Sequence, residues 1–552
     1  MRTGTGEVGA EPMGVDAWNL REVGTRDRRQ FVAEGWWPDH SVGQRMADGL
    51  AAHKDLPFVI HSRTRPWNGT FGAVLDLARR TASGLIARGV RPGDVVTFQT
   101  PNWLEGAVTF YAAAFVGAVV APIVHIYGSR ETSYILDACR PSVHVSAAGF
   151  GHQDFLANLD SMPEIPGMQL VVLDDAGPPG SIGFNRLLDA DPIESPVRVD
   201  PGTPALVGWT SGTTASPKGV VHSHQTVCAE IAQLGATSPP TERPSLMANP
   251  ISHAIGMLGA LLIPVDRGKP VHLVDQWDPG AVLDLIDSED LSAGGGAPYF
   301  LTSLLDDPRC GPEHLERLHF QGMGGAPVPR AVMERATEIG LTIYSMYGST
   351  EHPSITGCTF ADPLEKRLST DGRPLPGCDI KLVDPEGREV APGEPGQILS
   401  RGPECFLGYT DASLTAKVFD VDGWYHTGDI GVLDPDGYLS ITDRISDVII
   451  RGGENISAAE VEEVLMTLAG VAEVAVVAAP DTRMGEHAAA FFRMVDGRPA
   501  PDLPELRHYL EVAGVARQKW PEELIAVDEF PRTSSGKVQK YVLRDRLRDG
   551  TV

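Results

Sequence analysis

One short stretch limits the fold and the chemistry of this chain more than any other. It runs from Trp209 to Val220 (WTSGTTASPKGV), mixes hydroxyl residues and one lysine with glycines, and follows the apolar run Ala205–Val207. A short strand followed by a flexible, donor-rich loop can wrap N–H groups and hydroxyls around a polyphosphate. The Gly-Lys-Ser/Thr ending of a P-loop is missing. Composition alone leaves a polar surface turn open as the alternative.

Length and charge limit the number of domains and the kinds of partner. A chain of 552 residues exceeds the size at which one hydrophobic core keeps growing, so at least two domains are expected. The formal net charge of −27 argues against nucleic acid or an anionic membrane as the main partner, because both need clustered positive charge. ATP is not excluded, since a few local donors can hold it. Solubility alone would also account for the acidity.

Cysteine usage and apolar segments predict a cytoplasmic protein without a transmembrane segment. The six cysteines contain no CxxC pair, which indicates reduced thiols. Residues Met1–Asn19 lack the basic-then-apolar pattern of a signal peptide. The uncharged stretch Gly106–Val124 is long enough to suggest a transmembrane helix, but it is rich in alanine and glycine and contains Pro122. We expect a buried helix over about 103–116 and a core strand over about 119–124 instead.

Helical and strand patterns alternate through the first half of the chain. A helix is expected over about 38–53, and a clearer one over Phe71–Arg88, which Gly89 and Pro92 end. The remaining segments are a strand at 95–98, a helix at 133–139, and strands at 143–145 and 168–173. Such alternation predicts parallel sheets covered by helices. We therefore expect an α/β fold whose large N-terminal domain contains two helix-covered sheets.

The second half of the chain changes character twice. Short strands separated by Pro, Gly and Asp turns predict a β-rich subdomain, with strands at Ile380–Val383, Gln397–Leu399 and Tyr438–Ile441. The charged connector Asp443–Asp447 follows. Beyond it, Ser457 and Glu460 form a capping box before a helix to about 468, and strands follow at 471–479 and 487–494. We expect an N-terminal domain at 1–443, a hinge connector at 444–447, and a small mobile α+β C-terminal lid domain at 448–552.

Six further motifs follow the hydroxyl-rich stretch. They are Gly322–Pro327 (GMGGAP), Tyr347–Glu351 (YGSTE), Tyr425–Asp429 (YHTGD), Asp443-Arg444, Arg451–Asn455 (RGGEN) and Pro531–Lys537 (PRTSSGK). Each alone could be an ordinary loop, and the first fails as a dinucleotide fingerprint because Pro327 replaces the last glycine. In this order, the set resembles the adenylate-forming superfamily of acyl-CoA synthetases, adenylation domains and luciferases. Two departures are Ala215, where that family usually has glycine, and Ser446, where related enzymes usually carry Asp or Lys.

The resemblance implies which residues would hold ATP. Joining a carboxylate to a triphosphate brings two anions together, so catalysis depends on positioning and charge neutralisation. The phosphates would be held by Thr210, Ser211, Gly212, Thr213, Thr214 and Lys218. Tyr347 and Gly348, with the edge formed by Gly325, Ala326 and Pro327, would bind adenine. Asp429 would accept the ribose hydroxyls, and Arg444 would reach ribose or phosphate, although pairing with Asp443 or Asp447 is the alternative.

The resemblance also implies the catalytic groups and the path of the second substrate. Glu351 would hold Mg²⁺, a hard cation suited to carboxylate oxygen. Thr350 would donate to the α-phosphate, and Lys537 would bridge the carboxylate and α-phosphate oxygens during attack. Arg451, Gly452 and Gly453 would line the tunnel for coenzyme A after the lid has turned, with glycine allowing close backbone approach.

His253 and its neighbours bear on the acid. A lone histidine among apolar residues is usually a core side chain, but His253 matches the gate that the resembled enzymes place beside the carboxylate pocket. The next residue is Ala254, where adenylation domains for α-amino acids have aspartate to pair with the ammonium group. A buried ammonium would lack its counter-ion here, which favours a plain carboxylic acid. Ile255, Met257, Leu258 and the run Gly322–Gly324 suggest an apolar pocket.

The expected function is therefore an ATP-dependent carboxylic acid–CoA ligase. It would form acyl-AMP and pyrophosphate, then acyl-CoA and AMP, from a medium-chain, alicyclic or aryl acid. Gly35-Trp36-Trp37 adds to a general similarity to alicyclic and medium-chain acid ligases. The alternatives are an acyl-AMP ligase that loads a free carrier protein, a luciferase-like oxidoreductase, and a non-catalytic acyl or nucleotide sensor. A homodimer is the base-rate expectation.

Overall fold

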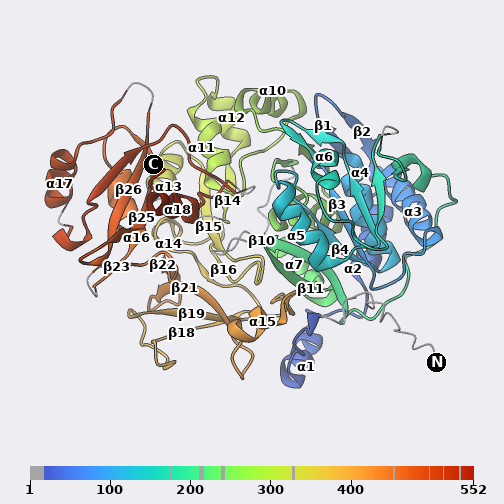
Figure 1. Ribbon diagram of the computed structural model, residues 1–552, viewed down its shortest axis with the longest axis horizontal. Helices are drawn as coiled ribbons and strands as arrows, with labels where there is room; N and C mark the ends of the chain where they lie inside the picture. Colours follow the sequence, from blue (N-terminus) through green and yellow to red (C-terminus); the bar gives the residue numbers. More distant parts are fainter. Residues whose placement is uncertain are drawn as a thin grey trace, which may run out of the picture.

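Two regions are visible in the computed structural model (Figure 1), which describes residues 18–174, 177–210, 217–237, 243–325, 328, 330–451, 454–495, 498–513, 515–533 and 536–551. We call the described residues of 18–443 the body and those of 448–551 the C-terminal unit. In Figure 1 the C-terminal unit, coloured orange to red, lies at the left of the body. The two are joined through β22, which ends at Arg444.

An eight-stranded sheet forms one half of the body. Its order is β20-β11-β10-β4-β3-β5-β8-β9. The strands are β20 (Gly408–Tyr409), β11 (Lys218–Ser223), β10 (Pro204–Thr210), β4 (Val119–Pro122), β3 (Val95–Gln99), β5 (Val143–Ser146), β8 (Gln169–Val172) and β9 (Ile182–Gly183). Neighbours from β10 to β9 are parallel, whereas β10, β11 and β20 pair antiparallel. The hydroxyl-rich stretch of the sequence lies between β10 and β11.

Two four-stranded sheets complete the α/β part of the body. The first is β12 (Leu246–Met247), β13 (Val271–Val274), β1 (Pro57–His61) and β2 (Trp67–Thr70). The second is β14 (Phe320–Met323), β15 (Thr342–Tyr347), β16 (Thr356–Gly357) and β17 (Arg373–Pro374). The expected α/β class is confirmed, with one sheet more than anticipated. The sequence pattern does not predict the third sheet, because β16 and β17 are two residues long and carry no alternating pattern.

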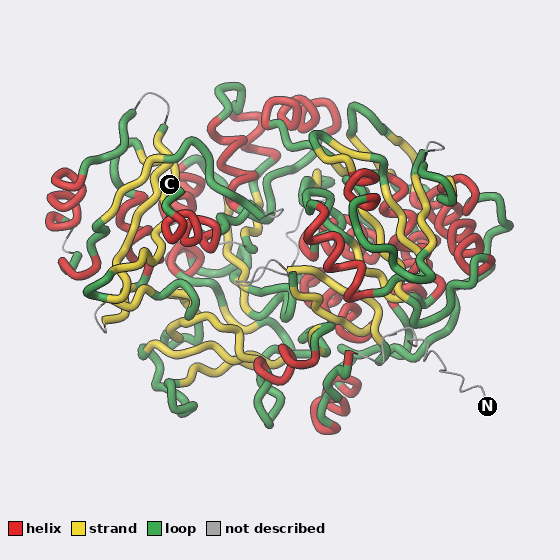
Figure 2. The backbone as a smooth tube through the Cα atoms, viewed as in Figure 1, coloured by secondary structure: helices red, strands yellow, loops and turns green. Residues whose placement is uncertain are grey.

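Helices pack against and around these sheets (Figure 2). They are α1 (Thr25–Ala33), α2 (Val42–Ala52), α3 (Phe71–Ala87), α4 (Leu104–Val116), α5 (Ser129–Cys139), α6 (Phe155–Asp160), α7 (His224–Ala236), α8 (Ala254–Gly256), the π-helix Met257–Leu262, α9 (Ile263–Arg267), α10 (Pro279–Glu289), α11 (Pro298–Asp306), α12 (Pro312–Arg317), α13 (Arg330–Glu338), α14 (Leu364–Ser369) and α15 (Ala412–Val418). A small ribbon joins β6 (Gly149–Phe150) and β7 (Gln153–Asp154).

The uncharged stretch from Gly106 forms the buried helix expected of it. Nearly every residue of α4 is buried, because α2 and α3 pack on it above the sheet. A helix that is apolar all round belongs inside a core. In the described part of the chain, no helix is long and apolar enough to cross a membrane.

The β-rich subdomain is an antiparallel sheet at the lower edge of the body in Figure 1. Its strands are β18 (Asp379–Val383), β19 (Pro395–Arg401), β21 (Tyr425–Leu433) and β22 (Leu439–Arg444). β21 and β22 pair so that Asp429 lies opposite Arg444. This register brings two of the expected site residues together.

The C-terminal unit has its own sheet and core. Its strands are β23 (Ile449–Arg451), β24 (Glu454–Ile456), β25 (Val471–Asp481), β26 (Gly485–Met494) and β27 (Glu523–Ala526). Its helices are α16 (Ala458–Met466), α17 (Leu503–Val512), the short 3₁₀ turn Arg517–Lys519 and α18 (Lys540–Asp549). Apolar side chains fill both faces of the β25–β26 pair. This arrangement matches the α+β class expected for the region.

Element ends differ from the expected ranges for local reasons. The helix expected from residue 38 begins at Val42, because the Ser41 hydroxyl accepts from Gln44 N and caps it. The helix expected from 133 already begins at Ser129, and the strand expected to 124 ends at Pro122. The capping box is only half present: Ser457 accepts from Glu460 N, whereas the Glu460 carboxylate pairs with Lys519.

Candidate active site

The two ends of the hydroxyl-rich stretch lie on an antiparallel pair of strands, β10 and β11. Thr210 ends β10, Lys218 begins β11, and the two lie opposite each other in the ladder. The Lys218 ammonium lies 5.7 Å from the centre of the Tyr409 ring. Ser211, Gly212, Thr213 and Thr214 lie outside the described residues, as does Ala215. The strands therefore fix both ends of the expected phosphate loop.

A hydrogen-bonded trio links β15, β21 and β22. The Tyr347 hydroxyl donates to Asp429 Oδ2 at 2.7 Å, and Arg444 Nε lies 3.1 Å from Asp429 Oδ1. Burial, followed by the negative charge of Asp429, raises the pKa of Tyr347 well above its ordinary value, so this hydroxyl stays protonated. Arg444 thus pairs with Asp429. Since each carboxylate oxygen has two lone pairs, Asp429 can still accept two further hydrogen bonds.

Glu351 and Thr350 are held by residues from other elements. The Tyr409 hydroxyl donates to Glu351 Oε1 at 2.8 Å, and Phe406 N donates to the Glu351 carbonyl. The Thr350 carbonyl lies 2.8 Å from His222 Nε2 on β11. A Cβ on Gly208 would approach the Thr350 methyl to 2.6 Å, so glycine on β10 allows this close packing.

Two glycines shape the expected adenine edge. A Cβ at Gly348 would lie 1.8 Å from the Pro353 carbonyl oxygen, which excludes every other residue without a backbone shift. Gly325 has a φ of +77°, a conformation that favours glycine, and lies against Ile255. Ala326 and Pro327 lie outside the described residues.

The segment that carries His253 is fixed by Asn102. The Asn102 amide donates to the Val274 and Asn249 carbonyls at 2.9 and 3.1 Å, and its oxygen accepts from Ile251 N at 2.8 Å. His253 then caps α8. Burial lowers the pKa of His253 to about 4, so its imidazole is neutral at neutral pH.

A cavity opens between Thr350 and the start of the π-helix. Its described lining is Leu206, Gly208, His222, Val227, Glu230, Ala254, Met257, Leu258, Leu262, Thr350 and Pro353. Most of these side chains are apolar, in line with the expected acid pocket. Met257 and Leu258 take part as expected, whereas Ile255 and the run Gly322–Gly324 are not among the residues that line it.

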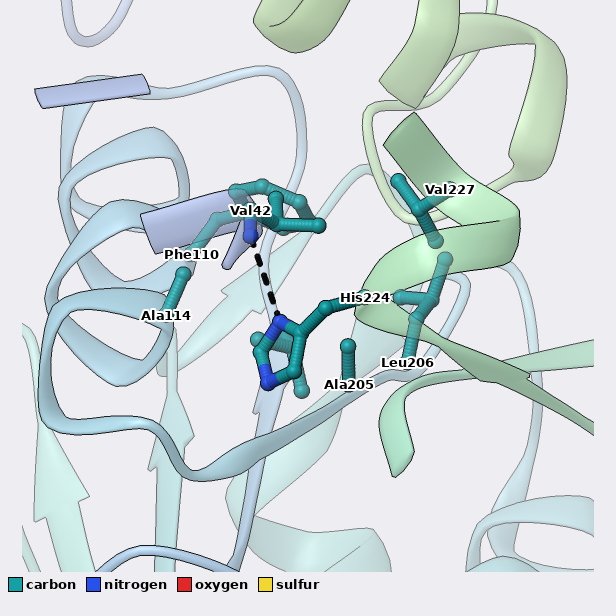
Figure 3. Close-up of a pocket in the computed structure, with 8 residues that line it drawn as sticks. Val42, Phe110, Ala114, Ala205, Leu206, His224 and Val227 are labelled. Carbon is teal, nitrogen blue, oxygen red and sulfur yellow. Dashed lines mark hydrogen bonds between the residues drawn. The ribbon is translucent and has the colours of Figure 1, made fainter. Parts of the chain in front are cut away.

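A second, smaller cavity is next to the first and shares part of its lining. Figure 3 shows it between α2, α4, β10 and α7, with His224 directed toward Val42, whose N–H lies 3.3 Å from His224 Nδ1. Leu206 and Val227 line both cavities and therefore form a shared wall. The lining of this second cavity is almost wholly apolar.

The C-terminal unit presents Lys537 to the body. Burial lowers the pKa of Lys537, and the nearby Arg444 cation lowers it further, whereas Asp429 and Asp447 oppose that effect. The lysine therefore lies within electrostatic reach of the Tyr347–Asp429–Arg444 trio. The loop docks on α11: the Arg532 guanidinium lies 5.6 Å from the centre of the Tyr299 ring, and Gly536 lies against Tyr299.

Partly buried charges surround the connector between the two regions. Arg544 of α18 pairs with Asp447 at 2.8 Å, and Lys540 pairs with Glu462 at 2.7 Å. Although burial opposes it, the nearby Glu462 and Asp447 raise the pKa of Lys540. Ser446 contributes its carbonyl, which accepts from Arg544. Asp447, one residue later, thus forms the ion pair that the side chain of Ser446 cannot form.

Arg451 lies apart from the residues above. Its Nε is 2.7 Å from Glu522 Oε1 within the C-terminal unit. Gly452 and Gly453 lie outside the described residues. The structure therefore brings together Thr210, Lys218, Thr350, Glu351, Tyr347, Asp429, Arg444 and Lys537, and leaves Arg451 elsewhere.

Sequence reasoning missed several residues that hold this site. Tyr409 supports Glu351 and lies under Lys218, His222 holds the Thr350 carbonyl, and Tyr299 receives the C-terminal loop. His222 could have been found, since it belongs to the strand that follows the hydroxyl-rich loop. Tyr409 and Tyr299 carry no spacing signal, because their partners are far away in sequence.

The fold, together with the residues gathered around Asp429, agrees with the class of adenylate-forming enzymes that the order of the motifs indicates. Residues 47–410 match the AMP-binding enzyme family, and residues 460–537 match the AMP-binding enzyme C-terminal domain. The chain belongs to this family.

Relatives of the chain include several acid–CoA ligases. It is 31% identical over 525 residues to the medium-chain fatty-acid–CoA ligase of Escherichia coli, covering 94% of this chain and 92% of that protein. It is 34% identical over 500 residues to the 3-[(3aS,4S,7aS)-7a-methyl-1,5-dioxo-octahydro-1H-inden-4-yl]propanoyl:CoA ligase of Rhodococcus jostii, covering 87% and 94%. ATP-bound MatB from Rhodopseudomonas palustris superposes with a TM-score of 0.79 at 27% identity, covering 92% and 100%.

Proposed function

We propose that this chain is an ATP-dependent carboxylic acid–CoA ligase. The acid attacks the α-phosphate of ATP to give acyl-AMP and pyrophosphate, and the thiol of coenzyme A then displaces AMP to give the thioester. Family membership supports the enzyme class and the acid–CoA ligase relatives support the reaction. The observation that carries the proposal is that Lys537 of the C-terminal unit lies within electrostatic reach of the paired Asp429 and Arg444.

The body binds and orients the nucleotide in this proposal. Asp429 accepts the ribose hydroxyls with its remaining lone pairs, while Tyr347 and Arg444 keep its carboxylate in place. Thr210, Lys218 and the loop between them hold the β- and γ-phosphates. Thr350, fixed through its carbonyl by His222, donates to the α-phosphate. Preorganised donors of this kind are effective because they need no rearrangement as charge develops.

Glu351 fits the role of a Mg²⁺ ligand. It is a largely buried carboxylate, and Tyr409 ties only its Oε1. Carboxylate oxygen is the ligand that this hard cation prefers. When bound, Mg²⁺ supplies charge neutralisation on the phosphates. The hydrogen bond from Tyr409 holds the Glu351 carboxylate in position for the metal ion.

Lys537 neutralises the charge that builds between the two reacting anions. Its loop is docked on α11, which keeps its ammonium within electrostatic reach of Asp429 and Arg444. For the second half-reaction, we propose that residues 444–447 act as a hinge between an N-terminal domain, 1–443, and a lid, 448–552. Rotation there withdraws Lys537 and brings Arg451, Gly452 and Gly453 to the path of coenzyme A. The Asp447–Arg544 pair keeps α18 on the connector.

The acid is a medium-chain, alicyclic or aryl carboxylic acid. The cavity beside Thr350 is walled mostly by apolar side chains, including Met257, Leu258 and Leu262. Ala254 lines it where aspartate would be needed for an α-ammonium group, so an α-amino acid would lose its counter-ion. The neutral His253 gates the carboxylate end. The E. coli relative, a medium-chain fatty-acid–CoA ligase, supports this size class.

The decisive experiment incubates purified protein with ATP, magnesium, coenzyme A and a panel of acids. Pyrophosphate release scores each acid, and mass spectrometry identifies the product. Thioester formation with coenzyme A alone supports the ligase. An AMP ester that is released only to an added carrier protein would overturn it in favour of a carrier-loading enzyme. Oxygen consumption would favour the luciferase-like alternative, and absence of ATP–pyrophosphate exchange would indicate a sensor.

The proposal also includes a cytoplasmic location and a homodimer. The six cysteines are all free, and five of them are buried. Free thiols suit a reducing compartment. Light scattering with the purified chain tests the dimer, and a monomeric mass would remove that part of the proposal.

A further inference from the structure

A carboxyl group lies in the wall of the otherwise apolar acid cavity. Glu230 sits in the middle of α7, is only 2% exposed, and lines the cavity together with Val227 one turn earlier. Glutamate is rarely buried so deeply without a pairing cation. None of the described residues that line this cavity is a lysine or arginine.

Only one oxygen of this carboxyl group is satisfied. The Ser354 hydroxyl donates to Glu230 Oε1 at 2.7 Å. Glu230 Oε2 is buried and has no hydrogen-bond partner among the described residues. A buried polar atom without a partner is costly, and such atoms in native proteins often mark a place where a ligand or water completes the bond.

Burial and a neighbouring negative charge favour the uncharged form of this carboxyl group. Burial, and then the negative charge of Glu404, raise the pKa of Glu230 to about 8, against a lowering by the Ser354 bond. At neutral pH Oε2 can therefore carry a proton and act as a donor. A protonated carboxyl group can donate to a carbonyl oxygen and can also share a hydrogen bond with a hydroxyl group.

We propose that Glu230 Oε2 forms a polar subsite in the acid cavity, and that it hydrogen-bonds to a hydroxyl or keto oxygen that the acid carries away from its carboxylate. In the proposed function the carboxylate end of the acid lies at Thr350 and His253, and Glu230 lines the same cavity from α7. A second carboxylate on the acid is disfavoured, because it would meet Glu230 without any cation in the described lining. This inference rests on the proposed ligase function and narrows its substrate class.

The chain offers a matched control on the same helix. Gln233 lies one turn beyond Glu230, is equally buried, and donates to the Pro376 carbonyl and to Cys378 Sγ. It is not part of the described cavity lining. Replacing Gln233 perturbs the same polar layer without touching the cavity. Its effect therefore separates a structural disturbance from loss of the subsite.

The first experiment needs only the wild-type protein. Pyrophosphate release is measured with cyclohexanecarboxylic acid and with its ring-hydroxyl, ring-oxo and ring-amino derivatives, substituted either opposite the carboxyl group or at the adjacent ring carbon. At least one hydroxyl or oxo acid is expected to exceed the parent acid about tenfold in kcat/KM, the value of one buried hydrogen bond. A parent acid equal to or better than every oxygen-bearing derivative overturns the subsite. If only a ring-amino derivative is preferred to the parent acid, the proposed hydrogen bond is overturned in favour of an ion pair between the ammonium group and Glu230.

Two variants then assign the preference to Glu230. Glu230→Leu is expected to remove the preference for oxygen-bearing acids and to raise kcat/KM for the parent acid, whereas Gln233→Leu keeps the wild-type ratio. Glu230→Gln retains an amide donor and is expected to keep part of the preference. The thermal midpoints of Glu230→Leu and Gln233→Leu are measured alongside, because Glu230→Leu also leaves the buried Ser354 hydroxyl without its acceptor. A preference that persists in Glu230→Leu overturns the assignment.

Failure of this inference is distinguishable from failure of the ligase proposal. If the parent acid is converted but the oxygen-bearing acids gain nothing, the ligase stands and the subsite falls. If no acid of either kind releases pyrophosphate, the ligase proposal falls and the subsite falls with it.

Discussion

In the body, Tyr347, Asp429 and Arg444 are held together across three strands, whereas the C-terminal unit presents Lys537 from a loop. Tyr347, Asp429 and Arg444 come from three strands of the body and its connector and bond to one another. Lys537 follows Gly536, which has a φ of +84°, and its loop meets the body at the exposed ring of Tyr299. We propose that the first arrangement serves as a rigid binding surface and the second as a removable contact.

This difference teaches how one chain can serve two half-reactions. Groups needed throughout, such as the ribose acceptor, belong to the rigid surface. A group needed only while the acid attacks ATP can be carried by the part that leaves. The following predictions test whether the two regions divide the chemistry in this way.

The largest expected effect comes from Lys537→Ala. Loss of a preorganised cation at the developing charge should slow acyl-AMP formation by about 10²–10³-fold. Thioester formation from supplied acyl-AMP should change less than about threefold, since in the proposed function Lys537 has left the site by then. Single-turnover measurements of each half-reaction check the outcome.

Lys519→Ala serves as the control for Lys537→Ala. Lys519 pairs with Glu460 on the surface of the same unit, and such pairs contribute little. Both half-reactions should keep wild-type rates in this variant. Equal losses in the two half-reactions of Lys537→Ala would contradict the division between the regions.

A smaller effect, in both half-reactions, is expected for Asp429→Ala. The change removes the acceptor for ribose and leaves Tyr347 and Arg444 without their shared partner. Loss of hydrogen bonds to a charged group corresponds to a decrease of about 10–100-fold in kcat/KM for ATP. Because the adenylate stays bound through both steps, thioester formation should also slow. Asp379→Ala, which breaks an exposed pair with Arg401, is the matched control.

The contrast between regions also explains what the sequence could predict. Tyr347, Asp429, Glu351 and Lys537 lie in short motifs whose order identifies the family, so their presence in one site was expected. The buried helix α4 and the alternation of helices with strands follow from apolar spacing.

Long-range contacts are what the sequence could not predict. The hydroxyl of Tyr409 reaches Glu351 across 58 positions, and Ser354 reaches Glu230 across 124. Only the packing of separate sheets decides such partners. The short strands β16 and β17 could not be predicted for a similar reason. Two-residue strands are defined by the strands they pair with rather than by their own sequence pattern.

Acid should weaken the body more than the C-terminal unit. Burial lowers the pKa of each of six body histidines to about 4; they are His125, His144, His222, His224, His253 and His272. Between about pH 6.5 and 4 the unfolded chain binds protons that the folded body does not, so stability is lost as pH falls. At about pH 5.5, one such histidine costs about 1.4 kcal/mol.

Limited proteolysis with peptide mapping at neutral pH and at about pH 5.5 measures this effect. The C-terminal unit has two histidines, His487 and His508, of which His508 is exposed. Cleavage at the lower pH should therefore rise first in the body. His144→Gln should reduce the pH dependence, because His144 is fully buried with Nε2 unpartnered among the described residues. First cleavage in the C-terminal unit would contradict the prediction.

The smallest expected effect concerns the contact through which the C-terminal loop docks. Tyr299→Ala removes the ring beneath Arg532, and an exposed cation–ring contact is worth about 0.5–1 kcal/mol. Acyl-AMP formation should slow by about two- to fivefold, because the docked position of Lys537 becomes less populated, while thioester formation from supplied acyl-AMP stays unchanged. Tyr299→Phe keeps the ring face and should match the wild type. If Tyr299→Phe were as slow as Tyr299→Ala, the hydroxyl rather than the ring would hold the loop; if both half-reactions slowed together, Tyr299 would belong to the rigid surface.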